Sequence, residues 1–256
     1  MTGAGRGTTP QPGGTVGESI TLSTGETVSV PLSTEATVYG AIFSADRGAV
    51  DELLPRGLEP IRATPRRAAV TFLAVEYHRI GDDAMPPYDE FSVMFPAVET
   101  GARSWPLASL FTHGASGYVW YLPVTTEPAK ALGVDIWGYP KEVAEIDHDA
   151  HVAGRRTTVS AEGRDVITLD VERAPAIDQV QEGASYTVED GTLLREPLTL
   201  DGNLGAWPFS AQAEWTLGDH PRADRLRELD LGSRALARLW FDGEFVIGAG
   251  EPVGTV

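Results

Sequence analysis

The sequence predicts an α+β protein that is mainly antiparallel β, a curled sheet or barrel with a few short helices. Most apolar runs are short, rich in β-branched and aromatic residues, and separated by turn residues, which is typical of strands. Helical spacing occurs in only a few short stretches, so a largely antiparallel sheet, curled into a barrel or a packed pair of sheets, fits best. No tandem repeat and no Pro/Gly-rich linker interrupts the chain, so residues 18–256 are expected to form one domain behind a flexible arm, 1–17.

The first half supplies most of the strand signals. Apolar and β-branched runs predict strands at 38–46, 68–80, 86–98 and 116–124. A helix is expected at 48–55, where apolar residues lie on one side and Pro55 stops the pattern. A second helix is expected at 127–137, since Ala129, Leu132 and Ile136 are spaced for one face.

The second half continues the β character. Residues 155–174 read as a hairpin around the turn "EGR", and further strands are expected at 191–200 and 211–219. Charges at helical spacing predict a surface helix at 222–231. The chain then closes, at 234–250, with strand pieces on either side of a "DG" turn.

Composition excludes several classes of function. The chain has 256 residues, 42% of them hydrophobic, so it can bury a sizeable core. Its net charge of −17 disfavours nucleic acid and anionic membranes as partners. The absence of cysteine excludes disulfides, thiolate metal sites and cysteine nucleophiles. With neither a signal peptide nor a long apolar run in the sequence, we expect a cytoplasmic protein.

One lysine stands out as a candidate nucleophile. The chain has two lysines, Lys130 and Lys141, and eighteen arginines. Lys141 follows "IWGYP", and apolar surroundings favour the neutral amine that attacks a carbonyl. Pro140 restricts the backbone before it, so the amine could be aimed rigidly. The alternative is an ordinary solvated lysine at the start of the amphipathic stretch "KEVAEI".

Other familiar sites find little support. His148 and His151 flank Asp149, a pattern better explained by a solvated polar turn than by a metal site. No Gly-x-Ser-x-Gly elbow is present, and the glycine-rich stretch 2–7 precedes no strand–helix unit. We therefore expect no metal and no cofactor.

The segment "YLPVTTEPAKALGVDIWGYPKEVAEI" (121–146) resembles the active-site segment of the acetoacetate decarboxylase family. That family carries an acidic-Pro-Ala step, then a Gly-Arg-Glu-like step, then an aromatic-Pro-Lys step. The strand "PYDEF" (87–91) and the late segment "WTLGDHPRADRLRELDL" (215–231) agree with it in order and spacing. The resemblance covers about residues 38 to 248 and implies an acetoacetate-decarboxylase-like curled sheet or barrel.

The resemblance implies roles for particular residues. Lys141 occupies the position of the lysine that forms a Schiff base, and Glu90 matches one of two glutamates near the amine. The position of the other glutamate falls on Leu73. The early arginine that would hold a substrate carboxylate has no counterpart in "EATVY" (35–39). Glu142 stands where the family has a second lysine, and beside the amine its carboxylate would favour the charged form.

These differences indicate a divergent member of the family. We expect a lyase that forms an imine between Lys141 and a ketone or 2-oxo substrate, with Glu90 as proton carrier. The reaction class stays open among decarboxylation, aldol or dehydration chemistry and cyclisation. Acetoacetate is expected to be a poor substrate, because its charge would meet Glu142 and Glu90. The resemblance also implies a homo-oligomer.

An alternative function uses the same scaffold without a covalent step. Aromatic side chains could shape an apolar pocket for a non-covalent cyclase or a small-molecule binding protein. Such a protein could act in secondary metabolism. In either case the side chains expected to contact the small-molecule carbonyl substrate are Tyr88, Trp120, Trp137, Tyr139 and Glu142.

Overall fold

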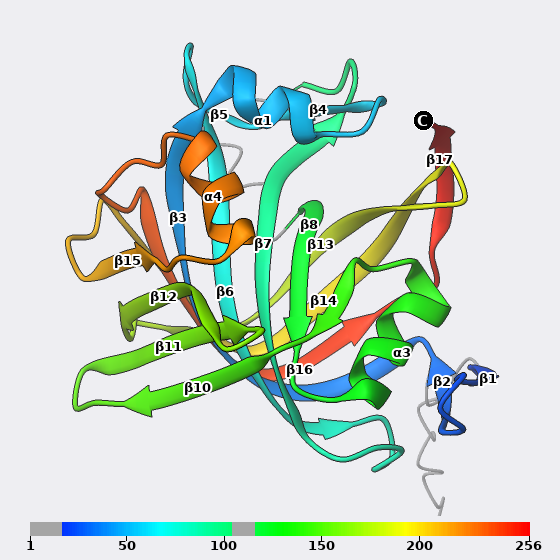
Figure 1. Cartoon of the computed structure of the whole chain (residues 1–256). Helices are drawn as coiled ribbons and strands as arrows, with labels where there is room; N and C mark the ends of the chain where they lie inside the picture. Colours follow the sequence, from blue (N-terminus) through cyan, green and yellow to red (C-terminus); the bar gives the residue numbers. More distant parts are fainter. Residues whose placement is uncertain (1–16, 104–115) are drawn as a thin grey trace, which may run out of the picture.

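The computed structural model describes residues 17–103 and 116–256. The expected arm, 1–17, lies outside these residues except for Gly17. Within the described chain, strands dominate and three short helices lie between them (Figure 1). The fold class expected from the sequence, mainly antiparallel β with few helices, is confirmed.

Seven strands close into a barrel. Their order is β7 (Tyr88–Glu99), β6 (Arg67–Ile80), β3 (Leu32–Asp46), β16 (Ala237–Ile247), β14 (Thr192–Pro208), β13 (Ile177–Glu189) and β8 (Gly117–Val124). A pairing between β8 and β7 closes the ring. Neighbours are antiparallel except β13 and β8, which are parallel. The ring removes most free strand edges and encloses an interior.

Short strands extend the barrel at several places. They are β4 (Leu58–Pro60), β5 (Arg62–Thr64), β9 (Lys141–Val143) and β17 (Glu251–Thr255). The strand β9 continues the sheet beyond β8, to which it is parallel. A separate hairpin, β1 (Glu18–Thr21) with β2 (Thr27–Val30), lies near the first barrel strand.

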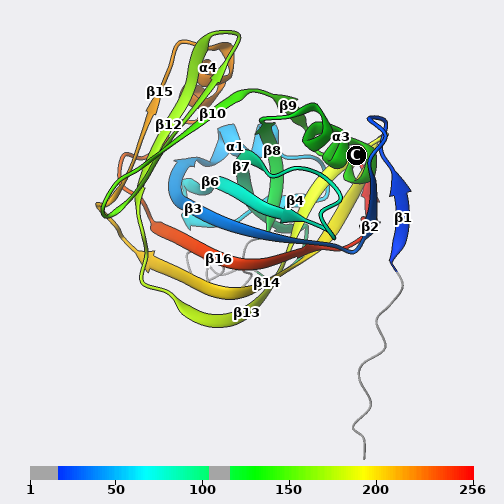
Figure 2. The ribbon, with the colours of Figure 1, turned by 90° about the horizontal axis from the view of Figure 1, so that it is seen from below.

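A second, four-stranded antiparallel sheet packs on the outside of the barrel. It contains β10 (Glu145–Ala150), β11 (Gly154–Ala161), β12 (Arg164–Glu172) and β15 (Ala213–Leu217). Figure 2 shows this sheet, with α4 (Pro221–Glu228), to one side of the strands that surround the interior. Helix α1 (Arg47–Leu53) and helix α3 (Glu127–Trp137) complete the chain.

The barrel strands separate two apolar cores. In β6, Phe72 joins an outer core with Val159 and Ile167 of the second sheet. Its neighbour Leu73 packs on an inner core with Val75. Side chains alternate between the two faces of a strand, so a strand covered on both sides is apolar throughout. This explains the largely apolar stretch 68–75, which only Thr71 interrupts.

Most of the expected elements match the structure closely. The strand expected at 68–80 is β6, and the helix expected at 127–137 is α3. The Thr126 side chain caps α3 by accepting from the Ala129 amide, and Gly138 ends it in the left-handed conformation. None of the helices in the described ranges is long and apolar enough to cross a membrane.

The expected "DG" turn is wrong. The strand β16 runs unbroken through Asp242 and Gly243. Gly243 pairs with Gly202 of β14, and a Cβ at Gly243 would lie 2.3 Å from the Asp201 carbonyl oxygen. The glycine therefore permits a close approach of two backbones rather than a reversal of the chain.

Candidate active site

The barrel interior contains a cavity of about 210 Å³. Its walls are mainly apolar, with Val38, Leu73 and Phe241 among the side chains that line it. A small set of polar side chains enters this lining, including Lys141 and Glu90. An apolar cavity with few polar groups is the usual form of a small-molecule site.

Lys141 and Glu90 form a buried ion pair inside the cavity. The Lys141 Nζ lies 2.8 Å from Glu90 Oε2, and the two side chains are 5% and 9% exposed. Lys141 begins β9 beside Leu122 of β8, and Glu90 lies on β7 opposite Val124. The barrel closure between β7 and β8 thus brings together two residues fifty-one positions apart in the chain. Burial of both charges makes each dependent on the other.

Three tyrosines surround this pair. Tyr77 Oη donates to Glu90 Oε1 at 3.4 Å, and Lys141 Nζ donates to Tyr88 Oη at 3.5 Å. Tyr139 also lines the cavity, and its hydroxyl lies 2.5 Å from Ser185 Oγ. Burial raises the pKa of each of the three tyrosines well above 10. They therefore remain neutral at physiological pH and can donate hydrogen bonds to charge that develops on a ligand.

A glycine in α3 makes room for the lysine. A Cβ at Gly133 would lie 2.4 Å from Lys141 Cε and 2.5 Å from its Cδ. The aliphatic part of the lysine side chain therefore passes directly over the helix at this residue. Glycine costs a helix about 1 kcal/mol relative to alanine. We attribute its presence here to the path of the lysine.

The structure brings five of the seven sequence-predicted site residues together. Tyr88, Trp137 and Tyr139 line the same cavity as Lys141 and Glu90. Trp137 is fully buried, and its indole nitrogen donates to the Gly248 carbonyl oxygen at 2.8 Å. The indole thus lies at the end of α3 where the chain turns toward the lysine.

Trp120 and Glu142 are not brought to the cavity. Trp120 packs against Phe95 and Tyr121 on the outer side of the barrel wall. Glu142 follows Lys141 in β9 and so points to the other face of the strand. Its Oε2 accepts from Arg222 Nη2 at 2.9 Å. This corrects the expectation that Glu142 lies beside the amine and repels a substrate carboxylate.

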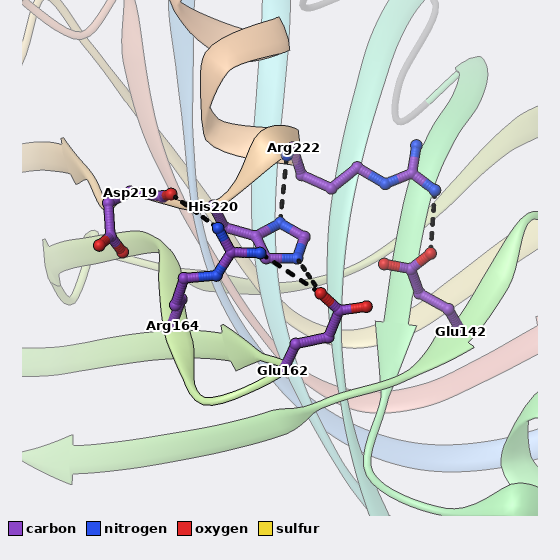
Figure 3. A network of polar contacts seen from close by, with 6 residues as sticks. All are labelled: Glu142, Glu162, Arg164, Asp219, His220 and Arg222. Carbon is purple, nitrogen blue, oxygen red and sulfur yellow. Dashed lines mark hydrogen bonds and ion pairs between the residues drawn. The ribbon is translucent and has the colours of Figure 1, made fainter.

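Figure 3 shows the network that holds Glu142 away from the interior. Arg222 is the second residue of α4, and its amide donates to Nδ1 of the helix cap His220 at 3.1 Å. His220 Nε2 lies 4.0 Å from Glu162 in the β11–β12 turn. Arg164 and the Asp219 carbonyl complete the set. The network joins the second sheet, α4 and β9, and it serves the packing of these elements rather than the cavity.

Several lining residues escaped sequence reasoning. Tyr77 shares the inward face of β6 with Leu73 and Val75, so period-two alternation could have found it. Ser92 lies two residues after Glu90 in β7, and its buried hydroxyl has no hydrogen-bond partner in the described chain. Ser185 had no local signal, because β13 was not expected there.

No three His, Asp or Glu side chains in residues 17–103 and 116–256 gather as ligands. His148 contacts Thr157 and Asp89, whereas His151 contacts Asp170. The two histidines named from the sequence therefore have separate partners.

Comparison with known proteins identifies the family. A sequence model of the acetoacetate decarboxylase family matches residues 19–255. The chain belongs to this family. A search of the curated proteins finds no match.

Solved structures agree in fold. An acetoacetate decarboxylase from Legionella pneumophila superposes with a TM-score of 0.64 at 14% identity, covering 88% of each chain. The enduracididine biosynthesis enzyme MppR gives 0.61 at 16% identity over 87% of this chain and 89% of that one. An acetoacetate-decarboxylase-like enzyme from Sphingomonas wittichii RW1 gives 0.56 at 16% identity, over 88% and 93%. At these identities the likeness establishes the fold alone.

Proposed function

We propose that this protein is a lyase-type enzyme that forms an imine between Lys141 and an uncharged, largely apolar ketone or 2-oxo compound. The observation that carries the proposal is the buried Lys141–Glu90 pair, 2.8 Å apart in an apolar cavity. A stable protein would gain little from burying an ion pair there, since apolar side chains of similar size are often as stabilising. Imine formation, which uses both groups, gives a reason for retaining the buried ion pair.

The first steps follow from the positions of the two groups. Glu90 takes a proton from the Lys141 ammonium, and the free amine adds to the carbonyl carbon to give a carbinolamine. Glu90 then returns the proton to the carbinolamine oxygen, which leaves as water. The product is a protonated imine, an electron sink for the bond next to the former carbonyl carbon.

The tyrosines support charge that develops during these steps. Tyr88 lies within hydrogen-bond distance of the amine, and Tyr77 contacts the Glu90 carboxylate. Neutral phenols donate to an oxyanion or enol without introducing a further charge. The remaining wall is apolar, which excludes water from the imine.

The walls favour a substrate without its own negative charge. Val38 and Leu73 line the cavity, where the family resemblance placed an arginine region and a glutamate. No cation besides Lys141 lines the described cavity, and Glu90 already pairs with it. A carboxylate ligand would lose its hydration without gaining a partner of its own.

The solved relatives support carbonyl chemistry on this fold. MppR has been determined with pyruvate, and also with the condensation product of pyruvate and imidazole 4-carboxaldehyde. We propose that the present chain uses the same kind of condensation on a more apolar partner.

Borohydride trapping tests the proposal. The protein is reduced in the presence of 2-nonanone, pyruvate or acetoacetate, and the modified residue is located by mass spectrometry. We expect a covalent adduct at Lys141, with the highest yield from 2-nonanone. Lys130 is a matched control within the same chain, because it is 42% exposed and pairs with Glu127 on the surface of α3. Adducts in equal yield at both lysines would contradict a selective imine site.

A second function is favoured by one observation. The Glu90 carboxylate contacts the Lys141 ammonium directly, within a mostly apolar lining. On this view the ammonium stays intact and donates a hydrogen bond to a ligand carbonyl, as in a non-covalent cyclase or a binding protein. It predicts that 2-nonanone binds the protein without any borohydride adduct, and that Lys141→Met weakens this binding.

A further inference from the structure

A second buried carboxyl lies behind the cavity wall. Glu196 on β14 is 0% exposed and has no part in the imine steps described above. Its Oε1 lies 2.8 Å from Thr187 Oγ1, and its Oε2 has no hydrogen-bond partner among the described residues. A buried carboxylate with one free oxygen would be costly, whereas a carboxylic acid would be much less so.

The hydroxyl of Thr187 indicates which form is present. Besides Glu196, it lies 2.7 Å from the carbonyl oxygen of Trp137. A hydroxyl has one hydrogen, and a carbonyl oxygen can only accept. Both contacts are satisfied when Glu196 carries a proton and donates to Thr187, which in turn donates to Trp137. Burial raises the pKa of Glu196 to about 7, in keeping with this arrangement.

Two hydroxyls connect Glu196 with the cavity. Ser185 lies directly opposite Glu196 in the β13–β14 ladder, so the two side chains are neighbours on one face of the sheet, where a hydrogen bond from Ser185 would favour the Glu196 carboxylate. Ser185 Oγ is 2.5 Å from Tyr139 Oη. Both Ser185 and Tyr139 line the cavity that holds Lys141. Glu196, Ser185 and Tyr139 therefore form a row that leads from the buried carboxyl to the cavity.

We propose that Glu196 is a second proton-holding group of the active site, which exchanges a proton with the bound ligand through the hydroxyls of Ser185 and Tyr139. Glu196 acts through these two hydroxyls and does not touch the ligand itself. The inference rests on the proposed imine chemistry, because it assigns the proton that this chemistry needs at carbon.

Transfer along the row balances without any further reactant. For transfer, the acid proton must leave its contact with Thr187 and face Ser185. The Glu196 carboxyl then gives this proton to Ser185 Oγ, the Ser185 proton passes to Tyr139 Oη, and the Tyr139 proton passes to the enamine carbon. The C–H bond forms, the enamine becomes an imine, and Glu196 is left as a carboxylate. Removal of a proton from that carbon reverses each step and restores the acid.

The division of labour follows from the positions of the two acids. Glu90 is bound to Lys141 and handles the protons of the amine and of the departing water. A separate donor is needed for carbon, because Glu90 exchanges its proton with the Lys141 nitrogen and the departing oxygen both when the imine forms and when it is hydrolysed. Tyr139 faces the cavity from the end of α3. Burial raises the pKa of Tyr139 well above 10, so Tyr139 alone would not release its proton, and Glu196 replaces the proton that Tyr139 gives up.

The groups that act on Glu196 are few. Arg195 is its chain neighbour and favours the carboxylate, less strongly than burial opposes it. Arg195 itself pairs with Glu251 of β17 at 3.4 Å. Tyr139 is the other titratable group in its reach, and Glu196 contributes to the raised pKa of that tyrosine.

Deuterium exchange tests the relay separately from imine formation. Uptake of deuterium at the carbon next to the carbonyl of 2-nonanone is followed by NMR, and borohydride trapping is measured in parallel. In Glu196→Gln we expect trapping as in the unmodified protein but exchange slowed at least tenfold. Ser185→Ala and Tyr139→Phe should slow exchange similarly, since each interrupts the row with the acid still present.

The pH profile separates proton transfer from a structural role. Exchange in the unmodified protein should change through pH 7, and this inflection should vanish in Glu196→Gln, which can still donate to Thr187. Glu196→Asp, which keeps an acid, should restore part of the rate. Equal exchange and an unchanged profile in Glu196→Gln would overturn the relay, as would trapping without exchange in the unmodified protein. Absence of trapping in the unmodified protein would instead refute the proposed function on which the relay rests.

An infrared measurement needs no turnover. The carbonyl stretch of a buried carboxylic acid should be present at pH 6 in the unmodified protein and missing from Glu196→Gln. Identical spectra would show that Glu196 is a carboxylate and would remove the proton the relay requires.

Discussion

Two adjacent residues of β9 form ion pairs of opposite kinds. Lys141 contacts Glu90 at 2.8 Å, and Glu142 contacts Arg222 at 2.9 Å. The distances are almost equal, but the first pair is 5% and 9% exposed and the second 34% and 41%. Solvent weakens an exposed pair to about 0–1 kcal/mol, whereas a buried pair carries a large desolvation cost. Burial, and not distance, therefore distinguishes the candidate site from an ordinary surface contact.

The strands around these residues show the same division. The outer faces of β6 and β7 are filled by close-packed side chains, with Phe72 and Phe91 rings 6.2 Å apart. The inner faces of the same strands carry Leu73, Glu90 and Ser92 and leave a cavity. Native cores leave few voids larger than a water molecule. An open inner face beside a filled outer face therefore points to a ligand rather than to poor packing.

Removal of Lys141 is the strongest way to test this distinction. Lys141→Met should abolish the borohydride adduct and any turnover, because no other amine lines the described cavity. It also leaves Glu90 buried without a partner, which typically costs about 3–5 kcal/mol. Trapping and urea denaturation measure the two effects, with Lys130→Met as the surface control.

The double variant Lys141→Met with Glu90→Gln separates chemistry from stability. It removes both charges, so most of the lost free energy of unfolding should return while the adduct stays absent. Glu90→Gln alone should retain the amine but lower turnover by about 10²-fold or more, the usual scale for a general acid–base. Unchanged turnover in this folded variant would remove Glu90 from the mechanism.

The pH dependence of stability distinguishes the buried carboxyl of Glu196 from the partly exposed carboxyl of Glu142. Burial raises the pKa of Glu196 from 4.5 to about 7, so the folded state binds a proton that the unfolded state has already released. Its contribution should be complete below pH 4.5 and decline as pH rises through 7, by roughly 3 kcal/mol. The difference in free energy of unfolding between the unmodified protein and Glu196→Gln should follow this curve. A difference that is flat between pH 4.5 and 8 would contradict a protonated Glu196.

The position of Lys141 can be disturbed without removing its charge. In Gly133→Ala, the new methyl group would meet the lysine side chain at 2.4 Å, so the amine must shift. Alanine favours a helix by about 1 kcal/mol over glycine, so the variant should lose little stability. Adduct formation should nevertheless slow by about tenfold, since a misplacement of 1 Å can cost up to 10²-fold. Trapping rates and thermal unfolding of the same sample check both points.

Sequence reasoning predicted the fold class because both signals it needs are local. Runs of apolar, β-branched and aromatic residues mark strands such as 68–80, and the helical spacing of Ala129, Leu132 and Ile136 marks α3. Lys141 and Glu90 were assigned to a site by family resemblance, and Tyr88, Trp137 and Tyr139 were expected to contact the substrate. The structure gathers all five around one cavity. The resemblance preserves order along the chain, and barrel closure turns that order into contact.

Other features depend on partners distant in the chain. The glycine of "DG" was read as a turn because its close neighbour, Gly202, lies forty-one residues away. Glu196 gave no signal, since its burial follows from the β13–β14 ladder and from the end of α3. Glu142 was misplaced for a similar reason. Its proximity to Lys141 in sequence was visible, but the opposite direction of its side chain depends on β9 and on Arg222.

Glu142→Gln is the smallest change and the most direct check on that correction. Glutamine keeps the shape of the side chain and removes its charge. The Arg222 pair should contribute about 0–1 kcal/mol to the free energy of unfolding, as measured by a double-mutant cycle with Arg222→Gln.

The activity of the same variant decides between the two positions of Glu142. Beside the amine, its carboxylate would repel acetoacetate, and two unit charges 4 Å apart repel by roughly 4 kcal/mol at an effective dielectric of 20. Neutralising it would then raise imine formation with acetoacetate by orders of magnitude. On the outer face, paired with Arg222 and near Tyr121, its charge is already compensated. We therefore expect adduct yields from acetoacetate and from 2-nonanone to stay within about twofold of the unmodified protein. A selective tenfold rise with acetoacetate would show that the Glu142 charge reaches the cavity, and that the two faces of β9 are electrically less separate than their geometry indicates.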